Sequence, residues 1–347
     1  MRQASTRRPI SQTGRKRLLA LTSLVAILCA GCERWNESSE ARRAANSEPL
    51  NLAISSYVGV ALIHVAVANR YFEKEGLRVT LQPHSAGRAA LDAVLSGRAD
   101  LATVAELPVT LSALQGQPVV ILATLASGGG DYAVVGRKNS GIDSASSLTG
   151  KRIGVTSGTS GDFFLDAFLV RHRLARSDVH VTNRKPEEMA DALAAGELDA
   201  VSTWEPYISI VRKRLGENAV VLSSTGIYES SFNLAASQDF LRARGDSVSR
   251  LLRALLHAEQ AYQRERASAE SIIADALGRP LDETKQILSR HRLGLSLDQG
   301  LLVMMEDEAR WAIRNQIVAS QAIPNFLPNI HLDGLLAVKP RSVTVIH

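Results

Sequence analysis

A helix–strand–loop pattern occurs twice in this 347-residue chain and limits its fold more than any other feature. The first copy, ALDAVLSGRADLATVAELP, covers 90–108, and the second, MADALAAGELDAVSTWEP, covers 189–206. In each copy a helical pattern ends at a glycine, Gly97 or Gly196, and a β-type run, a loop and a proline follow. Glycine commonly ends helices because it adopts the left-handed backbone conformation without steric cost. The repetition predicts two similar α/β units.

Short apolar runs alternate with helical patterns along the rest of the chain, which is typical of parallel strands covered by helices on both faces. We expect strands at 52–55, 77–81, 99–104, 119–124, 151–156, 179–182, 198–202 and 220–222, and helices at 61–75, 88–96, 109–115, 161–173 and 187–195. The segment 237–314 is expected to be mostly helical, with a break at Pro280. Ligands of open α/β sheets bind beyond the carboxyl ends of the strands. Two units with equivalent edges therefore predict a cleft between them.

The first 32 residues have the composition of an export signal. Three cations at 15–17 precede the apolar stretch 18–30, which is shorter than the roughly 20 residues that span a bilayer. Because Cys32 follows an alanine and a glycine directly, the segment looks like a bacterial lipoprotein signal, cut before Cys32 and lipidated on its sulfur. Cys29 stands where the usual pattern has leucine, and an ordinary signal peptide is the alternative. We expect a signal peptide at 1–31 and a lipidated cysteine with a flexible tether at 32–49.

Charge and cysteine content exclude several functions. The formal net charge is +5, but six of the 40 basic residues and none of the 35 acidic residues precede Cys32. The remaining chain is nearly neutral, so its composition gives no argument for a nucleic-acid partner. Cys29 and Cys32 are the two cysteines of the chain, and both belong to the expected signal region. The folded part therefore has no disulfide and no thiol ligand.

Hydroxyl, glycine, carboxylate and aromatic residues stand near the expected strand ends of both units. The candidate ligand-binding residues are Ser55, Tyr57, Ser85, Gly87, Glu106, Asp131, Ser157, Thr159, Ser160, Gly161, Trp204 and Glu205. For Trp204 the alternative is a core position, for Glu205 a solvated one, and for the segment 128–131 a flexible turn or hinge.

The segment TSGTSG at 156–161 follows an expected strand and precedes an expected helix. Its glycines let the backbone approach a ligand, and the free N–H groups at a helix start favour an anion. The alternative is a plain turn with Thr159 or Ser160 as N-cap. A nucleotide P-loop is excluded because the lysine and hydroxyl residue that end that motif are absent.

Three of the candidates, Glu106, Asp131 and Glu205, are carboxylates. A carboxylate repels a simple oxyanion, and an unpaired buried carboxylate is costly. We therefore expect a ligand that carries an amine or several N–H donors, unless these groups face water. Arg88 is the nearest basic residue to the expected cleft segments.

Five segments in order, GLRVTLQPHSAG, LSGRADLATVAELP, LTGKRIGVTSGTSGDFFL, LAAGELDAVSTWEPY and LLAVKPRSVTVI, resemble the extracytoplasmic solute-binding proteins of ABC importers. The group that they resemble handles nitrate, taurine, alkanesulfonates and thiamine-pyrimidine precursors, and the resemblance covers about residues 50–345. It implies a type II periplasmic-binding-protein fold, the Venus flytrap, whose two α/β lobes close on ligand by a hinge motion. Lobe 1 would comprise 50–135 and 235–347, and lobe 2 would comprise 136–234.

With this resemblance we expect a periplasmic or cell-envelope lipoprotein that captures a small polar solute. A taurine-like zwitterion or a nitrogen heterocycle fits the carboxylates better than nitrate does. The implied partners are an ABC permease with its ATPase subunits and the membrane reached through the lipid; we expect a monomer without cofactor or metal. A lipoprotein that senses ligand for a membrane receptor and a scavenger with an empty cleft are the alternatives. An enzyme is not expected, because no metal-ligand spacing, serine elbow or cysteine nucleophile is found.

Overall fold

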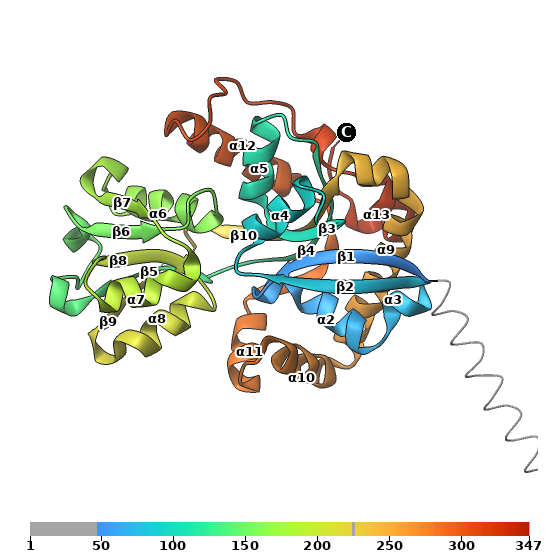
Figure 1. The fold of residues 1–347 in the computed structure, drawn as a ribbon, viewed down its shortest axis with the longest axis horizontal. Helices are drawn as coiled ribbons and strands as arrows, with labels where there is room; N and C mark the ends of the chain where they lie inside the picture. The colour runs from blue at the N-terminus through green and yellow to red at the C-terminus, as the bar shows by residue number, and fades with distance from the viewer. Residues whose placement is uncertain (1–46, 224–225, 347) are drawn as a thin grey trace, which may run out of the picture. The chain divides into compact units, whose positions relative to one another are not determined.

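Two mixed β-sheets, each flanked by helices, form the frame of the protein in this computed structural model (Figure 1). The structure describes residues 47–223 and 226–346, so the expected signal peptide, Cys32 and the expected tether up to residue 46 lie outside the described residues. The first sheet has the order β11-β4-β10-β3-β1-β2 and the second β7-β6-β8-β5-β9. The predicted α/β class is confirmed.

The strand bounds place one sheet in each lobe. The first sheet contains β1 (Glu48–Ser55), β2 (Leu77–His84), β3 (Leu101–Ala105), β4 (Val119–Gly129), β10 (Glu229–Ser237) and β11 (His291–Ser296). The second contains β5 (Tyr132–Arg137), β6 (Arg152–Val155), β7 (His180–Asn183), β8 (Ala200–Trp204) and β9 (Ala219–Ser223). The expected boundaries after residues 135 and 234 fall inside β5 and β10. The chain passes from one sheet to the other before these two positions. The first crossing joins β4 to β5, and the second joins β9 to β10.

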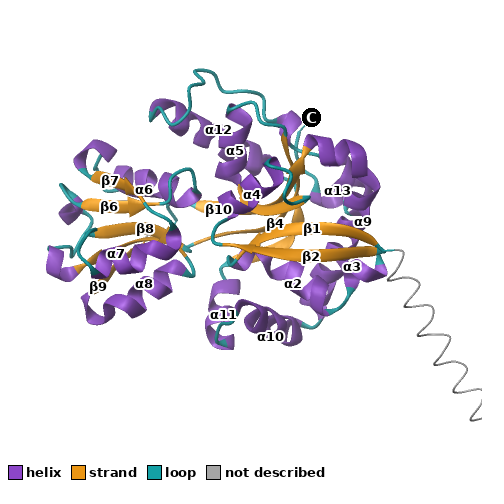
Figure 2. Cartoon of the chain, viewed as in Figure 1, coloured by secondary structure: helices purple, strands orange, loops and turns teal. Residues whose placement is uncertain are grey.

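Helices cover both faces of both sheets (Figure 2). Around the first sheet lie α2 (Ala61–Ala68), α3 (Tyr71–Lys74), α4 (Gly87–Leu95), α5 (Glu106–Leu114), α9 (Gln238–Arg264), α10 (Arg266–Leu277), α11 (Leu281–Leu288), α12 (Gln299–Arg314) and α13 (Leu332–Val338). Around the second lie α6 (Ser160–Arg171), α7 (Met189–Ala194) and α8 (Tyr207–Leu215). No helix in the described ranges 47–223 and 226–346 combines the length and the apolar character that a membrane crossing requires.

Both sheets are mixed, with antiparallel strands that the pattern of parallel strands did not predict. Strand β10 runs antiparallel to β3 and β4, and β5 runs antiparallel to β8 and β9. Each of these strands enters its sheet directly after a crossing, without the helix that a parallel connection needs. The apolar run of β4 was predicted correctly: its first eight residues, 119–126, are all buried, as expected for a strand covered on both faces.

The first described strand begins at Glu48, two residues before the expected start of lobe 1 at residue 50. Glu48 opens β1, and its carboxylate pairs with Arg244 and Arg250 and accepts a 2.6 Å hydrogen bond from the Ser247 hydroxyl. Helix α9, which carries these three partners, is thereby tied to the first strand. The sequence around Glu48 gave no sign of partners nearly 200 positions away.

Replacing Glu48 by glutamine should lower the free energy of unfolding by about 1 kcal/mol at neutral pH. Burial alone raises the pKa of Glu48, but the hydrogen bonds from Ser247 and Arg244 and the arginine charges outweigh it and lower the pKa below its usual value. This stabilisation is present above the ordinary glutamate pKa and is lost as the pH falls through the folded-state pKa. Urea unfolding at neutral pH and at about pH 3 measures it. An equal difference between wild type and variant at both pH values would contradict the assignment; Glu217→Gln, at an exposed position, is the control.

Candidate functional site

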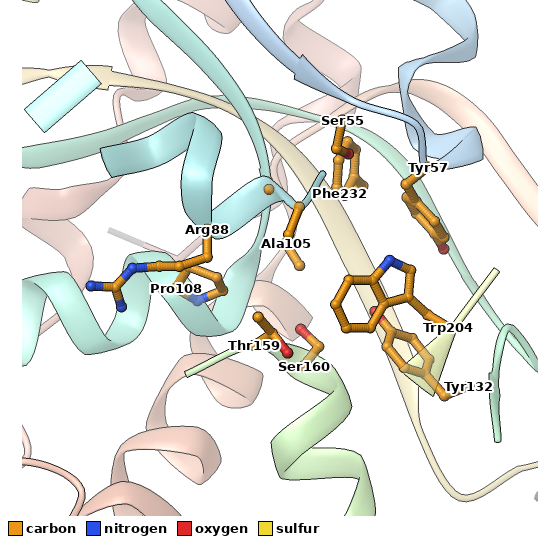
Figure 3. A pocket seen from close by; sticks show the side chains of 12 residues that line it. Ser55, Tyr57, Arg88, Ala105, Pro108, Tyr132, Thr159, Ser160, Trp204 and Phe232 are labelled. Carbon is orange, nitrogen blue, oxygen red and sulfur yellow. The ribbon is translucent and has the colours of Figure 1, made fainter. Parts of the chain in front are cut away.

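A cavity lies where side chains of both lobes meet (Figure 3). It is lined by Ser55, Tyr57, Ala86, Gly87, Arg88, Ala105, Pro108 and Phe232 from the first lobe and by Tyr132, Thr159, Ser160 and Trp204 from the second. Its volume is about 30 Å³, the room that about two water molecules need. The predicted cleft between two equivalent sheet edges therefore corresponds to a small cavity in this structure.

Two helices from opposite lobes begin at this cavity. Helix α4 begins at Gly87 after Ala86, and α6 begins at Ser160 after Thr159; neither start has a side-chain cap. The first N–H groups of a helix lack intrahelical partners and carry partial positive charge. Both helix starts therefore favour an anion in the space between them.

A third helix, α5, also begins beside the cavity but contributes apolar contact. Pro108 of α5 and Ala105, the last residue of β3, line the wall, and proline has no N–H group to offer. The carboxylate of Glu106 belongs to the same helix start and competes there with any anionic ligand. The attraction for an anion thus comes from α4 and α6. At α6 the first turn also holds the buried Asp162, which pairs with Arg176 and accepts from the Gly158 N–H at 3.3 Å.

Two serine hydroxyls in the wall make no hydrogen bond of ordinary geometry among the described residues. The Ser160 hydroxyl lies near that of Tyr132, whose pKa is raised by burial and lowered in part by Ser160. Ser55 is 4% exposed and Ser160 is 3% exposed, one from each lobe, and both line the cavity. A buried hydroxyl without a partner is destabilising, and native proteins seldom leave one unpaired. Ser55 and Ser160 are therefore available to donate to a bound molecule.

Arg88 is the basic residue in the cavity lining, and its guanidinium extends away from Ser160 and Trp204 (Figure 3). Its Nε donates to Asp92 Oδ1 at 3.0 Å, which leaves further guanidinium N–H groups available. A Cβ atom built on Gly158 would lie 3.5 Å from Arg88 Nη1, so this lobe 1 side chain reaches the TSGTSG turn of lobe 2. The turn residue Thr159 donates its own hydroxyl to the Thr156 carbonyl at 2.7 Å.

Aromatic rings line the cavity beside the polar groups. Tyr57 and Phe232 pack with centroids 4.9 Å apart, and Tyr132 and Trp204 line the cavity from the second lobe (Figure 3). A Cβ on Gly161 would lie 3.0 Å from the Trp204 ring, so the glycine lets the indole lie against the start of α6. The cavity therefore combines a polar side with an aromatic side.

Six of the twelve candidate residues line the cavity: Ser55, Tyr57, Gly87, Thr159, Ser160 and Trp204. Three others lie next to it with different roles. The Ser85 carbonyl accepts a 2.7 Å hydrogen bond from Tyr207, the exposed Ser157 donates its N–H to Asn183 Oδ1, and Gly161 supports Trp204. Tyr132 and Phe232 also line the cavity but were not among the candidate residues. Both lie near the crossings between the lobes, whose positions the sequence predicted only approximately.

The carboxylate of Glu106 does not line the cavity. It is fully buried, and it accepts hydrogen bonds from Tyr228 and from the N–H and hydroxyl of Ser231, at 2.9 and 3.1 Å. Glu308 lies beside it and accepts from Thr110 at 2.9 Å. Burial raises the pKa of Glu106, and burial together with the charge of Glu106 raises the pKa of Glu308 well above its usual value. We infer that this pair holds at least one proton at neutral pH and serves the fold.

Asp131 and Glu205 do not line the cavity either. Asp131 is fully buried and accepts from Tyr57 at 2.9 Å and from His291 at 2.6 Å. Glu205 accepts from Ser209 Oγ at 3.0 Å and pairs with Arg279 at 3.5 Å. We expected these three carboxylates to select a ligand that carries an amine. That expectation was wrong, because each carboxylate is paired with other groups of the protein.

Comparison with known proteins identifies the family. The family described as "NMT1/THI5 like" matches residues 59–267. The chain belongs to this NMT1/THI5-like family. A Bacillus subtilis protein provisionally named an aliphatic sulfonates-binding protein is 28% identical over 52% of this chain and 55% of its own length. The taurine-binding periplasmic protein of Escherichia coli is 24% identical over 48% of this chain and 52% of its own length.

The chain thus matches little more than half the length of these two curated relatives. Among solved structures, the alkanesulfonate-binding protein SsuA from Xanthomonas axonopodis pv. citri, bound to MOPS, superposes with a TM-score of 0.70 at 19% identity. The match covers 82% of this chain and 98% of SsuA. The predicted resemblance and the type II periplasmic-binding-protein fold are confirmed, and all three of these proteins are named as binding proteins. Within the described ranges, no group of three histidine, cysteine or acidic side chains is placed to hold a metal.

Replacing Glu106 by alanine should destabilise the protein by about 2–3 kcal/mol. The change leaves the Tyr228 hydroxyl and the Ser231 N–H without their buried acceptor. Chemical unfolding measures the loss, with the exposed Glu217→Ala as the matched control. A variant as stable as wild type would contradict the structural role given to Glu106.

Proposed function

We propose that this chain is the extracytoplasmic solute-binding component of an ABC importer and that its solute is a small organic oxyanion of the alkanesulfonate class. The family, the names of the relatives and the chemistry of the cavity support this proposal. The observation that carries it is the pair of unpartnered hydroxyls, Ser55 and Ser160, beside the starts of α4 and α6.

A sulfonate matches the polar side of the cavity. It keeps one negative charge and presents three acceptor oxygens, so it can accept from both serines and from the helix N–H groups together. Arg88 adds a charged donor, because a planar guanidinium can donate to two sulfonate oxygens at once. Because these donors belong to both lobes, the anion stabilises the closed form over the open one.

The aromatic side accounts for an organic rather than an inorganic anion. Tyr57, Tyr132, Trp204 and Phe232 would contact an alkyl chain, which nitrate does not have. The free energy of transferring that chain from water adds about 0.8 kcal/mol per buried methylene group. The aromatic rings therefore favour an organic anion over nitrate.

Taurine is the second candidate solute, because an aromatic ring can attract its ammonium group. None of Glu106, Asp131 and Glu205 lines the cavity, so these carboxylates offer an ammonium group no partner there. The Trp204 face can still attract a cation by a cation–π interaction. We therefore expect taurine to bind, with no advantage over an alkanesulfonate of the same length.

The volume of the cavity requires motion for binding. About 30 Å³ does not admit a sulfonate with its alkyl chain, so the lobes have to separate at the two crossings before the solute enters. Glycines in the first crossing suit a hinge, since Gly130 already has a φ of 82°. Closure on the solute and reopening at a permease would then follow.

Calorimetry with ethanesulfonate, taurine and nitrate tests the proposed solute. We expect ethanesulfonate and taurine to bind and nitrate to bind weakly or not at all. Ser160→Ala should weaken ethanesulfonate binding about tenfold or more, because it removes a hydrogen bond to a charged group. The exposed Ser144→Ala is the matched control. Tight nitrate binding without affinity for ethanesulfonate, or unchanged affinity in Ser160→Ala, would contradict the proposal.

The membrane anchor and the importer are tested in cells. We propose that lipid on Cys32 anchors the protein in the cell envelope, so Cys32→Ser should release it from the membrane fraction and abolish labelling by a radioactive fatty acid. Cells that lack the protein should fail to take up labelled ethanesulfonate. Normal uptake together with a lost transcriptional response to ethanesulfonate would favour the sensing alternative instead.

A further inference from the structure

A buried cluster of Tyr57, Asp131 and His291 lies at the first crossing and contacts the cavity through Tyr57. We propose that His291 is a positioning residue for solute binding: as an imidazolium it holds Asp131, which in turn holds Tyr57 in the cavity wall. Solute affinity then depends on the proton on His291. This inference rests on the solute-binding function proposed above, and nothing in the sequence pattern singled out His291.

The contacts of the His291 ring with Ile287 and Asp131 are both met when the ring carries two N–H groups. Its Nδ1 lies 2.8 Å from the Ile287 carbonyl oxygen, which can only accept, so Nδ1 carries a hydrogen. Its Nε2 lies 2.6 Å from Asp131 Oδ2, which as a carboxylate oxygen also accepts. A neutral ring has one N–H group, whereas an imidazolium has two. The geometry therefore favours the imidazolium.

Asp131 links the ring to the cavity. The residue lies between β4 and β5, and its Oδ2 also accepts from the Tyr57 hydroxyl at 2.9 Å. The Tyr57 ring packs on Phe232 and lines the cavity with it. If His291 loses its Nε2 proton, a lone pair faces the Asp131 carboxylate at 2.6 Å. The Tyr57 hydroxyl, 3.0 Å from Nε2, can then turn from Asp131 and donate to the ring, so the cluster rearranges. Tyr57 and the first crossing are the parts that this rearrangement moves.

Few other charges act on the ring. Arg290 Nη2 lies 3.5 Å from Asp131 Oδ1 and is half exposed, and the Tyr132 hydroxyl is the other titratable group near the Tyr57–Asp131 contact. Of the helices packed against β11, α9 presents Glu259, which pairs with Lys339 and the Leu295 N–H instead. Helix α2 carries His64, whose pKa is lowered by burial alone. Asp131 is therefore the main partner of His291.

The balance of these effects keeps the proton on His291. Burial alone lowers the pKa of His291, but the hydrogen bond and the charge of Asp131 outweigh burial and raise the pKa above its usual value. A raised folded-state pKa gives a stabilisation that is complete below the ordinary histidine pKa and is lost as the pH rises through the folded-state pKa. Weaker solute binding is therefore expected on the alkaline side.

Calorimetry across about pH 5 to 9 tests the inference, with ethanesulfonate as the probe because its sulfonate does not titrate in this range. In wild type we expect the dissociation constant to rise about tenfold or more as His291 loses its proton. His291→Gln should bind weakly throughout and lack this pH dependence. The matched control is His257→Gln, a half-exposed histidine of α9 that should keep the wild-type profile.

Two further measurements keep the test decisive if His291→Gln does not fold. Tyr57→Phe retains the ring but removes the hydroxyl that Asp131 holds, and it should weaken binding and reduce the pH dependence. In wild type, saturating ethanesulfonate should raise the pKa of His291 measured by NMR, because coupling between proton and solute is reciprocal.

The outcomes separate the two proposals. If ethanesulfonate binds but the pH dependence is the same in wild type, Tyr57→Phe and His291→Gln, or if saturation leaves the NMR titration of His291 unchanged, the inference is overturned while the proposed function stands. If ethanesulfonate does not bind at any pH, the proposed solute is overturned together with the inference.

Discussion

The positive ends of two helices, α4 from one lobe and α6 from the other, point into one small cavity. Uncapped helix starts and unpartnered hydroxyls are destabilising when they are buried without an acceptor. The Ser55 and Ser160 hydroxyls and the first N–H groups of α4 and α6 are the polar groups available to a molecule in this cavity. A bound anion satisfies both lobes together, and this couples recognition to closure.

Buried polar clusters hold both crossings between the lobes. At the first, Asp131 is paired with Tyr57 and His291; at the second, Tyr228 and Ser231 donate to Glu106. Such networks are stable only when their members are satisfied, and they specify one arrangement of the groups that they join. The carboxylates near the cavity thus stabilise the crossings, while the solute meets hydroxyls, N–H groups, Arg88 and aromatic rings.

The sequence predicted what is decided locally. Gly97 and Gly196 end their helices with φ values of 72° and 78°, and the TSGTSG segment is a strand–helix turn at the cavity. Strand β10 was not predicted, because its ESSFNLAAS sequence is rich in polar residues. Those polar groups have distant partners: Asn233, for example, accepts from Thr124 at 2.7 Å. The carboxylates were misassigned for the same reason, since Glu308 and His291 lie far along the chain from Glu106 and Asp131.

The position of the sulfonate group in a crystal of the protein with ethanesulfonate tests the central claim most directly. Anomalous scattering locates the solute's sulfur without prior assumptions about its binding mode. Our account predicts a sulfur peak between the starts of α4 and α6, with its oxygens within hydrogen-bonding distance of the Ser55 and Ser160 hydroxyls. A peak outside the lobe-to-lobe cavity, for example in the smaller cavity lined by Glu205 and Arg279, would contradict the account.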